Sequence, residues 1–378
     1  MLSVTAIDRL RHVRAFDLHS DACTRESSGH RWRTAVHGAT REAVAQFVAT
    51  RCSPDLEAAG LTVASDVLHE FIDGGKSIRS TFMYLGWLCG AEDDAAALRA
   101  AAGLELLHAF ALLQDDVMDD ADLRRGRPAG HVAFAQWHRR QELSGSPGRF
   151  GESAAVLLGD LCLVWAAQMM RESGVPVAAL ERVRPRYDAM RVELAIGQFA
   201  DLINDASGFP TLDQVLDVSR RKSGNYTVRR PLELGAAMAG CDESVLALLG
   251  EYGDAIGEAF QMRDDLLGIF GSPSVTGKPS GSDLLERKAT TVVVAAYHLA
   301  DRSQRRQLRE LMSAGDLDAA EIERWRALIA ASGAVDWIEK LIDSRLTQAL
   351  TIVDAADVRS EARIALAEMA AACSERTS

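Results

Sequence analysis

The chain has 378 residues, a net charge of -12 at pH 7, 48% hydrophobic residues and 6% aromatic residues. This composition predicts a globular protein with a substantial core, and the acidic balance excludes a general nucleic-acid binder, because such proteins neutralise phosphates with surplus Lys and Arg. The six cysteines are scattered without a Cys-x-x-Cys pair, which argues against a zinc site or a disulfide framework and predicts a reduced, cytoplasmic location.

The first 35 residues predict a loosely ordered leader, because they are polar, broken by Ser27-Ser28-Gly29 and without sustained apolar periodicity. Residues 36–378 show no compositional seam and predict one domain. The longest apolar stretch, Ala154 to Met170, is interrupted by Asp160 and Gln168, so we predict a buried helix and no membrane span.

Abundant Ala and Leu, with apolar residues at helical spacing, predict an all-α protein built as a single large helical bundle. The expected helices are two within 40–70, then 104–122, 153–172, 177–204, 210–224, 226–240 and 245–270, followed by short amphipathic helices in 290–378. The loop 271–282 is long enough to be a lid.

A basic helix start follows the glycine pair Gly74-Gly75. Lys76 and Arg79 lie three apart, where free N–H groups and the positive end of the helix dipole attract anions. The pattern therefore indicates a phosphate site, with an exposed basic first turn as the alternative.

An acidic helix end follows at Asp115-Asp116 and Asp119, one turn apart, with His108 two turns earlier on the same face. Three carboxylates so placed repel one another unless a cation binds, and oxygen ligands suit Mg2+. The arginines of 124–127 add anchors for phosphate. The alternatives are a solvated acidic surface and, for His108, a core histidine.

A second carboxylate pair, Asp264-Asp265, ends another long apolar helix that also carries Gln261. Two helices that each deliver an Asp pair suit a diphosphate gripped through bridging metal ions. Lys222-Ser223, near the end of an expected helix, either joins such a site or caps the helix dipole.

With these motifs, the chain resembles the trans-isoprenyl diphosphate synthases of the polyprenyl synthetase family, across about residues 39–370. The signatures occur in family order: Gly74-Gly75-Lys76-Ser77-Ile78-Arg79, Asp115-Asp116-Val117-Met118-Asp119 with Arg124-Arg125-Gly126-Arg127-Pro128, Lys222-Ser223-Gly224, Phe260-Gln261-Met262-Arg263-Asp264-Asp265, and the loop from Lys278 to Lys288.

The resemblance implies an isoprenoid-synthase bundle with a central cavity and up to three Mg2+ ions around an allylic diphosphate. The implied metal ligands are Asp115, Asp116, Asp119 and Asp264. The implied residues for the allylic diphosphate are Arg124, Lys222, Ser223, Gln261 and Lys278, with Lys288 on the flexible loop. The implied residues for metal-free binding of isopentenyl diphosphate are Lys76, Arg79, His108 and Arg125. Catalysis is assigned to Asp115, Asp119, Lys222 and Asp264.

The chain departs from the family pattern at four positions. Ser77 and Ser80 stand where many relatives have Arg and Pro, Gln114 replaces a His that often precedes the first Asp pair, and Gly268 stands where a third Asp is common. We expect these changes to weaken the isopentenyl diphosphate site and to remove an outer carboxylate.

The resemblance also suggests the product length. Phe110 and Ala111 lie shortly before the first acidic motif, and that motif has no two-residue insertion. Their combination resembles geranylgeranyl diphosphate synthases, with farnesyl or geranyl diphosphate as the alternative product. Relatives are usually homodimers, so we expect a homodimer. The expected partners are the small-molecule substrates.

Three other functions share some of these residues. A terpene cyclase shares the acidic motifs but has no second diphosphate to bind, and Lys76, Arg79 and Arg125 argue against it. A di-iron carboxylate protein is suggested by Glu105-Leu106-Leu107-His108, but no other His has Glu three residues before it. A non-catalytic partner subunit disagrees with the intact first motif.

Overall fold

The computed structural model describes residues 22–206, 209–272, 281–315 and 317–374. Contacts divide the chain into two compact units, each made of separate segments. Unit 1 comprises Met1–Val183, Leu234–Cys241 and Arg359–Ala365, and unit 2 comprises Arg184–Glu233, Asp242–Val358 and Leu366–Ser378. Most described residues are helical, so the predicted all-α class is confirmed. The predicted single domain and its central cavity stay predictions.

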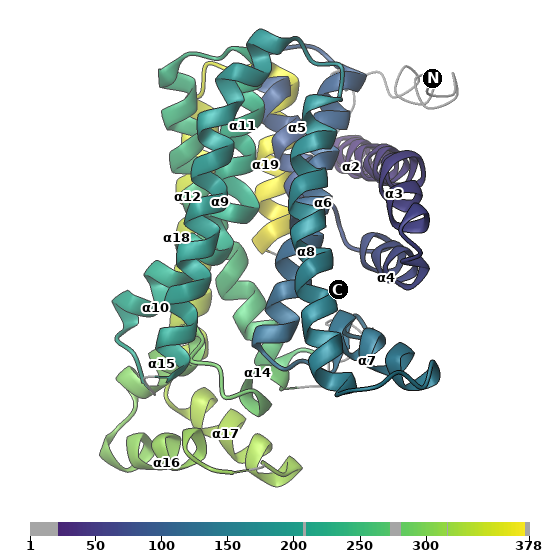
Figure 1. Cartoon of the computed structure of the whole chain (residues 1–378). Helices are drawn as coiled ribbons and strands as arrows, with labels where there is room; N and C mark the ends of the chain where they lie inside the picture. Colours follow the sequence, from purple (N-terminus) through teal and green to yellow (C-terminus); the bar gives the residue numbers. More distant parts are fainter. Residues whose placement is uncertain (1–21, 207–208, 273–280, 316, 375–378) are drawn as a thin grey trace. The chain divides into compact units, whose positions relative to one another are not determined.

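Unit 1 is built around one buried helix, α6 (Ala95–Met118), which begins where the Asp94 side chain accepts the backbone N–H groups of Ala96 and Ala97. The α6 helix runs beside α8 and also packs on α5 and α2 (Figure 1). The other elements of this unit are α2 (Ala22–Phe47), the π-helix η1 (Val48–Cys52), α3 (Ser53–Ala58), α4 (Thr62–Ile72), α5 (Ile78–Gly90), β1 (Leu123–Arg124), β2 (Arg127–Pro128), α7 (Gly130–Arg140) and α8 (Pro147–Arg171).

Unit 2 is built around α12 (Glu243–Phe270), whose N-cap Asp242 accepts the N–H of Val245. Its apolar face packs with later helices around the fully buried Trp325 and Ile338. The other elements are α10 (Leu212–Ser219), the π-helix η2 (Arg220–Arg229), α14 (Ser282–Leu285), α15 (Thr291–Leu299), α16 (Arg302–Met312), α17 (Ala319–Ala331) and α18 (Ala334–Ala355).

Three helices pass from one unit into the other along the chain: α9 (Val177–Ala206), α11 (Arg230–Ala239) and α19 (Ser360–Ser374). The boundary in α9 falls beside Pro185, which cannot donate a helical hydrogen bond.

Two expectations can be compared with the helix bounds. The predicted leader covers residues 1–35, and α2 begins within that range, at Ala22. The stretch 154–170, for which we predict a buried helix and no membrane span, lies in α8, which has 25 residues and, like α6, is long and apolar enough to cross a membrane by length and composition alone. The protein itself buries 61% of the α6 window and 44% of the α8 window. The predicted absence of a span therefore stays a prediction.

Candidate functional site

The acidic end of α6 carries three carboxylates in two environments. Asp115 and Asp119 are partly exposed, whereas Asp116 is fully buried. Arg124 donates from Nε to Oδ1 of Asp116 at 2.8 Å, and its Nη2 lies 3.8 Å from Asp115. Although burial opposes the charge, the bond to Asp116 and the neighbouring carboxylates raise the pKa of Arg124 above its usual value. Asp115 and Asp119 are therefore the two carboxylates of this motif that solvent reaches.

A two-stranded hairpin, unexpected from the sequence, holds the arginines in place. Strands β1 and β2 pair antiparallel with Arg124 opposite Arg127. The two turn residues, Arg125 and Gly126, have φ values of 52° and 75°, the left-handed pair of a type I′ turn. The tight turn sends Arg124 back to the end of α6 and leaves Arg125 free to extend toward α4 and α5.

The glycine pair accommodates Arg125. Its Nη1 donates to the carbonyl of Phe71 at 3.4 Å, and a Cβ on Gly74 or Gly75 would lie 3.2 or 2.9 Å from its guanidinium nitrogens. Both glycines also have positive φ values, of 128° and 94°. The backbone conformation therefore favours glycine at both positions, and the absence of side chains leaves room for the Arg125 guanidinium.

His108 lies close to the basic groups that the sequence analysis grouped with it. Burial, followed by the charges of Arg79, Arg125 and Arg124, lowers the pKa of His108 well below its ordinary value. His108 is therefore neutral at pH 7, and the cations around it make an electrostatic environment that favours an anion.

At three positions where the chain departs from the family pattern, the side chain has a hydrogen-bond partner in unit 1. The Ser80 hydroxyl donates to Glu105 at 2.6 Å and ties α5 to α6. The Ser77 hydroxyl lies 3.2 Å from Nδ1 of His37 on α2. The Gln114 amide donates to Asp160 of α8 at 3.0 Å.

Lys222 lies in unit 2 on the π-helix η2, where it donates to Asp201 of α9 at 2.6 Å, and Ser223 beside it is partly exposed. The expected helix end at Gly224 is wrong, because α10, η2 and α11 follow one another without a break. Gly224 packs on Gly257 of α12, where an added Cβ would lie 3.0 Å from the Gly257 backbone. Glycine at this position therefore allows the two helices to pack closely, and it does not end the helix.

On α12 the second acidic pair is again divided between two environments. Asp264 is exposed, whereas Asp265 is buried and accepts from Gln261 Nε2 at 2.7 Å and from the Thr291 N–H at 2.9 Å. Burial raises the pKa of Asp265 to about 7, against these hydrogen bonds and with the help of nearby Asp283. Asp265 thus fixes the helix to the start of α15, and Asp264 is the carboxylate presented to solvent.

Gly268 is explained by a residue that the sequence analysis did not single out as chemically important. A Cβ at Gly268 would lie 2.0 Å from Oδ2 of Asp283 on α14, so the carboxylate of Asp283 occupies the space of the missing side chain. Lys288 follows α14 and pairs with Glu286 at 3.0 Å. Lys278 and most of the predicted lid lie outside the described residues.

Phe110 and Ala111 lie on α6, both partly exposed. The backbone of α8 approaches closely there, since a Cβ on Gly159 would lie 3.6 Å from the Phe110 carbonyl and 3.2 Å from Gln114. The packing of α6 on α8 therefore fixes the orientation of this part of α6.

The predicted site residues that the structure describes fall into two groups according to the unit to which they belong. The unit 1 group contains Lys76, Arg79, His108, Asp115, Asp116, Asp119, Arg124 and Arg125. The unit 2 group contains Lys222, Ser223, Gln261, Asp264 and Lys288. Sequence reasoning missed the role of Asp283, because its contact with Gly268 joins two different helices.

A comparison with protein families matches residues 62–329 to the polyprenyl synthetase family. A geranylgeranyl diphosphate synthase of Mycobacterium tuberculosis is 32% identical over 78% of this chain and 79% of its own. A farnesyl diphosphate synthase of the same species is 32% identical over 74% and 73%. The crystal structure of a Corynebacterium glutamicum geranylgeranyl pyrophosphate synthase, complexed with isoprenyl diphosphate and magnesium, superposes with a TM-score of 0.85 at 34% identity, covering 90% of this chain and 98% of that one.

Proposed function

This chain belongs to the polyprenyl synthetase family, and from that premise we propose that it is a Mg2+-dependent prenyltransferase that makes geranylgeranyl diphosphate from isopentenyl diphosphate and an allylic diphosphate. The observation that carries the proposal is the basic environment of His108, created by Arg79, Arg124 and Arg125, on the helix that ends in Asp115. An anion site on the same helix as solvent-reached carboxylates suits a second diphosphate, which a terpene cyclase does not bind.

The donor set fits Mg2+. Among the described residues, no group of three or more His, Cys, Asp or Glu side chains is arranged to hold a metal ion by itself. Mg2+ keeps several waters and is bound through one or two carboxylates together with substrate phosphates, so it needs no protein cage. The family resemblance assigns this role to Asp115 and Asp119 of unit 1 and to Asp264 of unit 2, and the metal, when bound, would draw charge onto the leaving diphosphate. The same finding disfavours a di-iron site within the described chain.

The protein's own groups divide the remaining work. Arg124 and Lys222 would hold the allylic diphosphate and stabilise its charge as the carbon–oxygen bond breaks. Lys76, Arg79 and Arg125 would bind isopentenyl diphosphate, and neutral His108 would add a hydrogen bond without a further positive charge. Attack by the double bond is followed by loss of a proton to the departing diphosphate, so the proposal needs no protein base. Alignment of both substrates contributes the rest of the acceleration.

The geranylgeranyl product rests on Phe110 with the adjacent Ala111 and on the similarity to synthases with that printed name. Farnesyl diphosphate is the second candidate, favoured by similarity to a farnesyl synthase. Because these products differ by one five-carbon unit, the floor of the binding site decides between them.

A cytoplasmic homodimer completes the proposal. The apolar side chains Val156, Leu157, Leu161 and Val164 of α8 are 37% to 64% exposed, and unit 2 carries a second exposed stripe on α9 with Val192, Ile196, Phe199 and Ile203. Exposed apolar patches mark protein interfaces. Light scattering of the purified protein measures the mass, and Leu157→Glu is expected to yield monomer.

The function is tested by incubating the purified protein with labelled isopentenyl diphosphate and dimethylallyl, geranyl or farnesyl diphosphate, with Mg2+ or with a chelator. We expect a twenty-carbon product that requires the metal. Asp115→Ala is expected to lower turnover by about 10²-fold or more. A fifteen-carbon product would replace the geranylgeranyl assignment, and a hydrocarbon released from geranylgeranyl diphosphate alone would overturn the proposal.

A further inference from the structure

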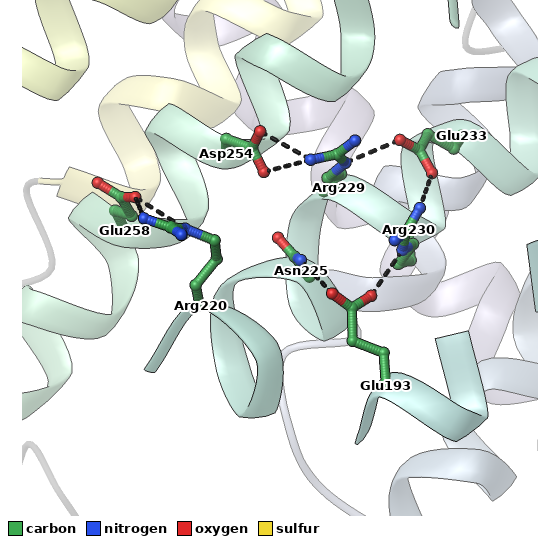
Figure 2. Close-up of polar contacts among 8 residues, drawn as sticks. All are labelled: Glu193, Arg220, Asn225, Arg229, Arg230, Glu233, Asp254 and Glu258. Carbon is green, nitrogen blue, oxygen red and sulfur yellow. Dashed lines mark hydrogen bonds and ion pairs between the residues drawn. The ribbon is translucent and has the colours of Figure 1, made fainter. Parts of the chain in front are cut away.

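The π-helix that carries Lys222 is tied at both of its ends to one helix. Its first residue, Arg220, donates from Nε and Nη2 to Oε1 of Glu258 at 3.2 and 3.0 Å. Its last residue, Arg229, donates from Nη1 to both oxygens of Asp254 at 2.9 and 2.8 Å (Figure 2). Asp254 and Glu258 lie one turn apart on α12, so two ion pairs bracket the segment that holds Lys222.

Between these ion pairs the backbones are in direct contact. A Cβ on Gly257 would lie 2.7 Å from the Gly224 Cα, and a Cβ on Gly253 would lie 2.5 Å from the Arg229 Cα. The π-helix is therefore pressed against α12 along its length, and it cannot rotate about its own axis without losing one of the ion pairs.

The far end of η2 is also linked to α9 and α11 (Figure 2). Arg229 Nε donates to Glu233 at 2.8 Å, and the other oxygen of Glu233 accepts from Arg230 at 2.7 Å. Arg230 donates to Glu193 at 2.8 Å, and Glu193 accepts from the Asn225 amide at 2.5 Å. Glu193 lies on α9, the helix that also carries the Lys222 partner Asp201. The network thus joins the helix of the lysine to the helix of its carboxylate.

A π-helix has a wider turn than an α-helix and is less favourable, so its register needs support from its surroundings. A change of register by one residue would turn Lys222 away from its present direction. We infer that the two ion pairs Arg220–Glu258 and Arg229–Asp254 fix the register of η2 and so position Lys222 for the allylic diphosphate. The inference rests on the proposed function, because it takes Lys222 as a diphosphate ligand.

The chain offers a matched control. Glu258 uses its second oxygen to accept from Nε of Arg345 on α18 at 2.7 Å. Arg220 and Arg345 therefore bind the same carboxylate, with side chains 43% and 34% exposed, but only Arg220 belongs to η2. Removing either arginine takes one ion pair from Glu258, whereas only Arg220→Ala releases the π-helix.

The test measures KM for the allylic diphosphate, KM for isopentenyl diphosphate, kcat, the dissociation constant for inorganic diphosphate by calorimetry and the melting temperature. Arg220→Ala and Arg229→Gln are expected to raise the allylic KM and the diphosphate dissociation constant about tenfold, with the isopentenyl KM changed less than twofold. Arg220→Lys, which retains the charge, is expected to recover most of the loss. Arg345→Ala is expected to lower the melting temperature as much as Arg220→Ala and to leave both constants unchanged.

Lys222→Ala separates failure of this inference from failure of the proposed function. If Lys222→Ala weakens diphosphate binding and Arg220→Ala does not, the positioning role is wrong and the lysine assignment stands. If Lys222→Ala has no effect, the lysine assignment fails and the inference fails with it. Equal kinetic effects of Arg220→Ala and Arg345→Ala would also overturn the inference, because the ion pairs would then act only on stability. Should Arg229→Gln fail to fold, the more exposed Arg220 variants decide the question.

Discussion

The ion pair between Arg124 and Asp116 makes a quantitative prediction about stability. Asp116 is fully buried, Arg124 is 17% exposed, and the Nε to Oδ1 distance is 2.8 Å. At an effective dielectric constant of about 20, unit charges at that distance attract by roughly 6 kcal/mol, which desolvation of both groups largely offsets. Arg124→Ala removes the attraction and leaves the carboxylate buried. We therefore expect the free energy of unfolding to fall by about 3–5 kcal/mol.

The assay is equilibrium urea unfolding without metal or substrates, so that lost ligand binding does not contribute. The double variant Arg124→Ala/Asp116→Asn is expected to regain much of the stability, because the uncompensated charge is gone. Arg149→Ala is the surface control, since its pair with Glu152 has an arginine that is 80% exposed, and we expect it to cost less than about 1 kcal/mol. A loss of that small size for Arg124→Ala would refute the reasoning.

Three further predictions concern Gly268, His108 and two buried cysteines. Gly268→Ala places a Cβ 2.0 Å from Oδ2 of Asp283 and is expected to lower the melting temperature, whereas Gly268→Ala/Asp283→Ala is expected to restore it; no recovery would contradict the steric account. The folded-state pKa of His108 lies below the ordinary 6.5, so the unfolded chain takes up a proton before the folded protein does as the pH falls below about 6.5. The free energy of unfolding should then decrease by at most ~1.4 kcal/mol per pH unit. Urea unfolding of the His108→Gln variant between pH 7 and 5 should show a smaller dependence on pH. Burial raises the pKa of Cys52 and of Cys89 to about 12, so neither thiol should react with iodoacetamide at pH 8 until the protein is unfolded, and peptide mass spectrometry detects the labelled sites.

Much of the fold was predictable because its signals are local. Both α6 and α12 are long, strongly apolar stretches without an internal proline, although α6 begins at its N-cap Asp94, earlier than the expected residue 104. The basic residues after the glycine pair also lie at a helix start, as expected, with Lys76 before α5 and Arg79 in its first turn. Patterns within some 20 residues of sequence therefore located both acidic motifs on their helices.

Features that depend on distant partners were not predictable. Gly224 has the sequence signature of a helix end, but its meaning is set by Gly257 on another helix. The hairpin at Arg125-Gly126 is too short to show strand alternation. Gly268 reads in sequence as the loss of a carboxylate, whereas the structure places Asp283 in the vacated space. For the two glycines the deciding contact joins residues on different helices, whereas the hairpin is local but has only two residues in each strand.

The hydrogen-bond donors around each carboxylate show whether it stabilises the fold or lies exposed to solvent. Glu193 and Glu233 each accept from internal donors with both oxygens, so their charge is used within the fold. Asp116 is likewise held by Arg124, and Asp265 by backbone and amide donors. Asp264 is exposed, and it is the kind of carboxylate that a cation from solution can reach. Each acidic motif thus combines a carboxylate that is buried and hydrogen-bonded within the protein with one that solvent reaches, and that distinction is visible only once the helices are packed.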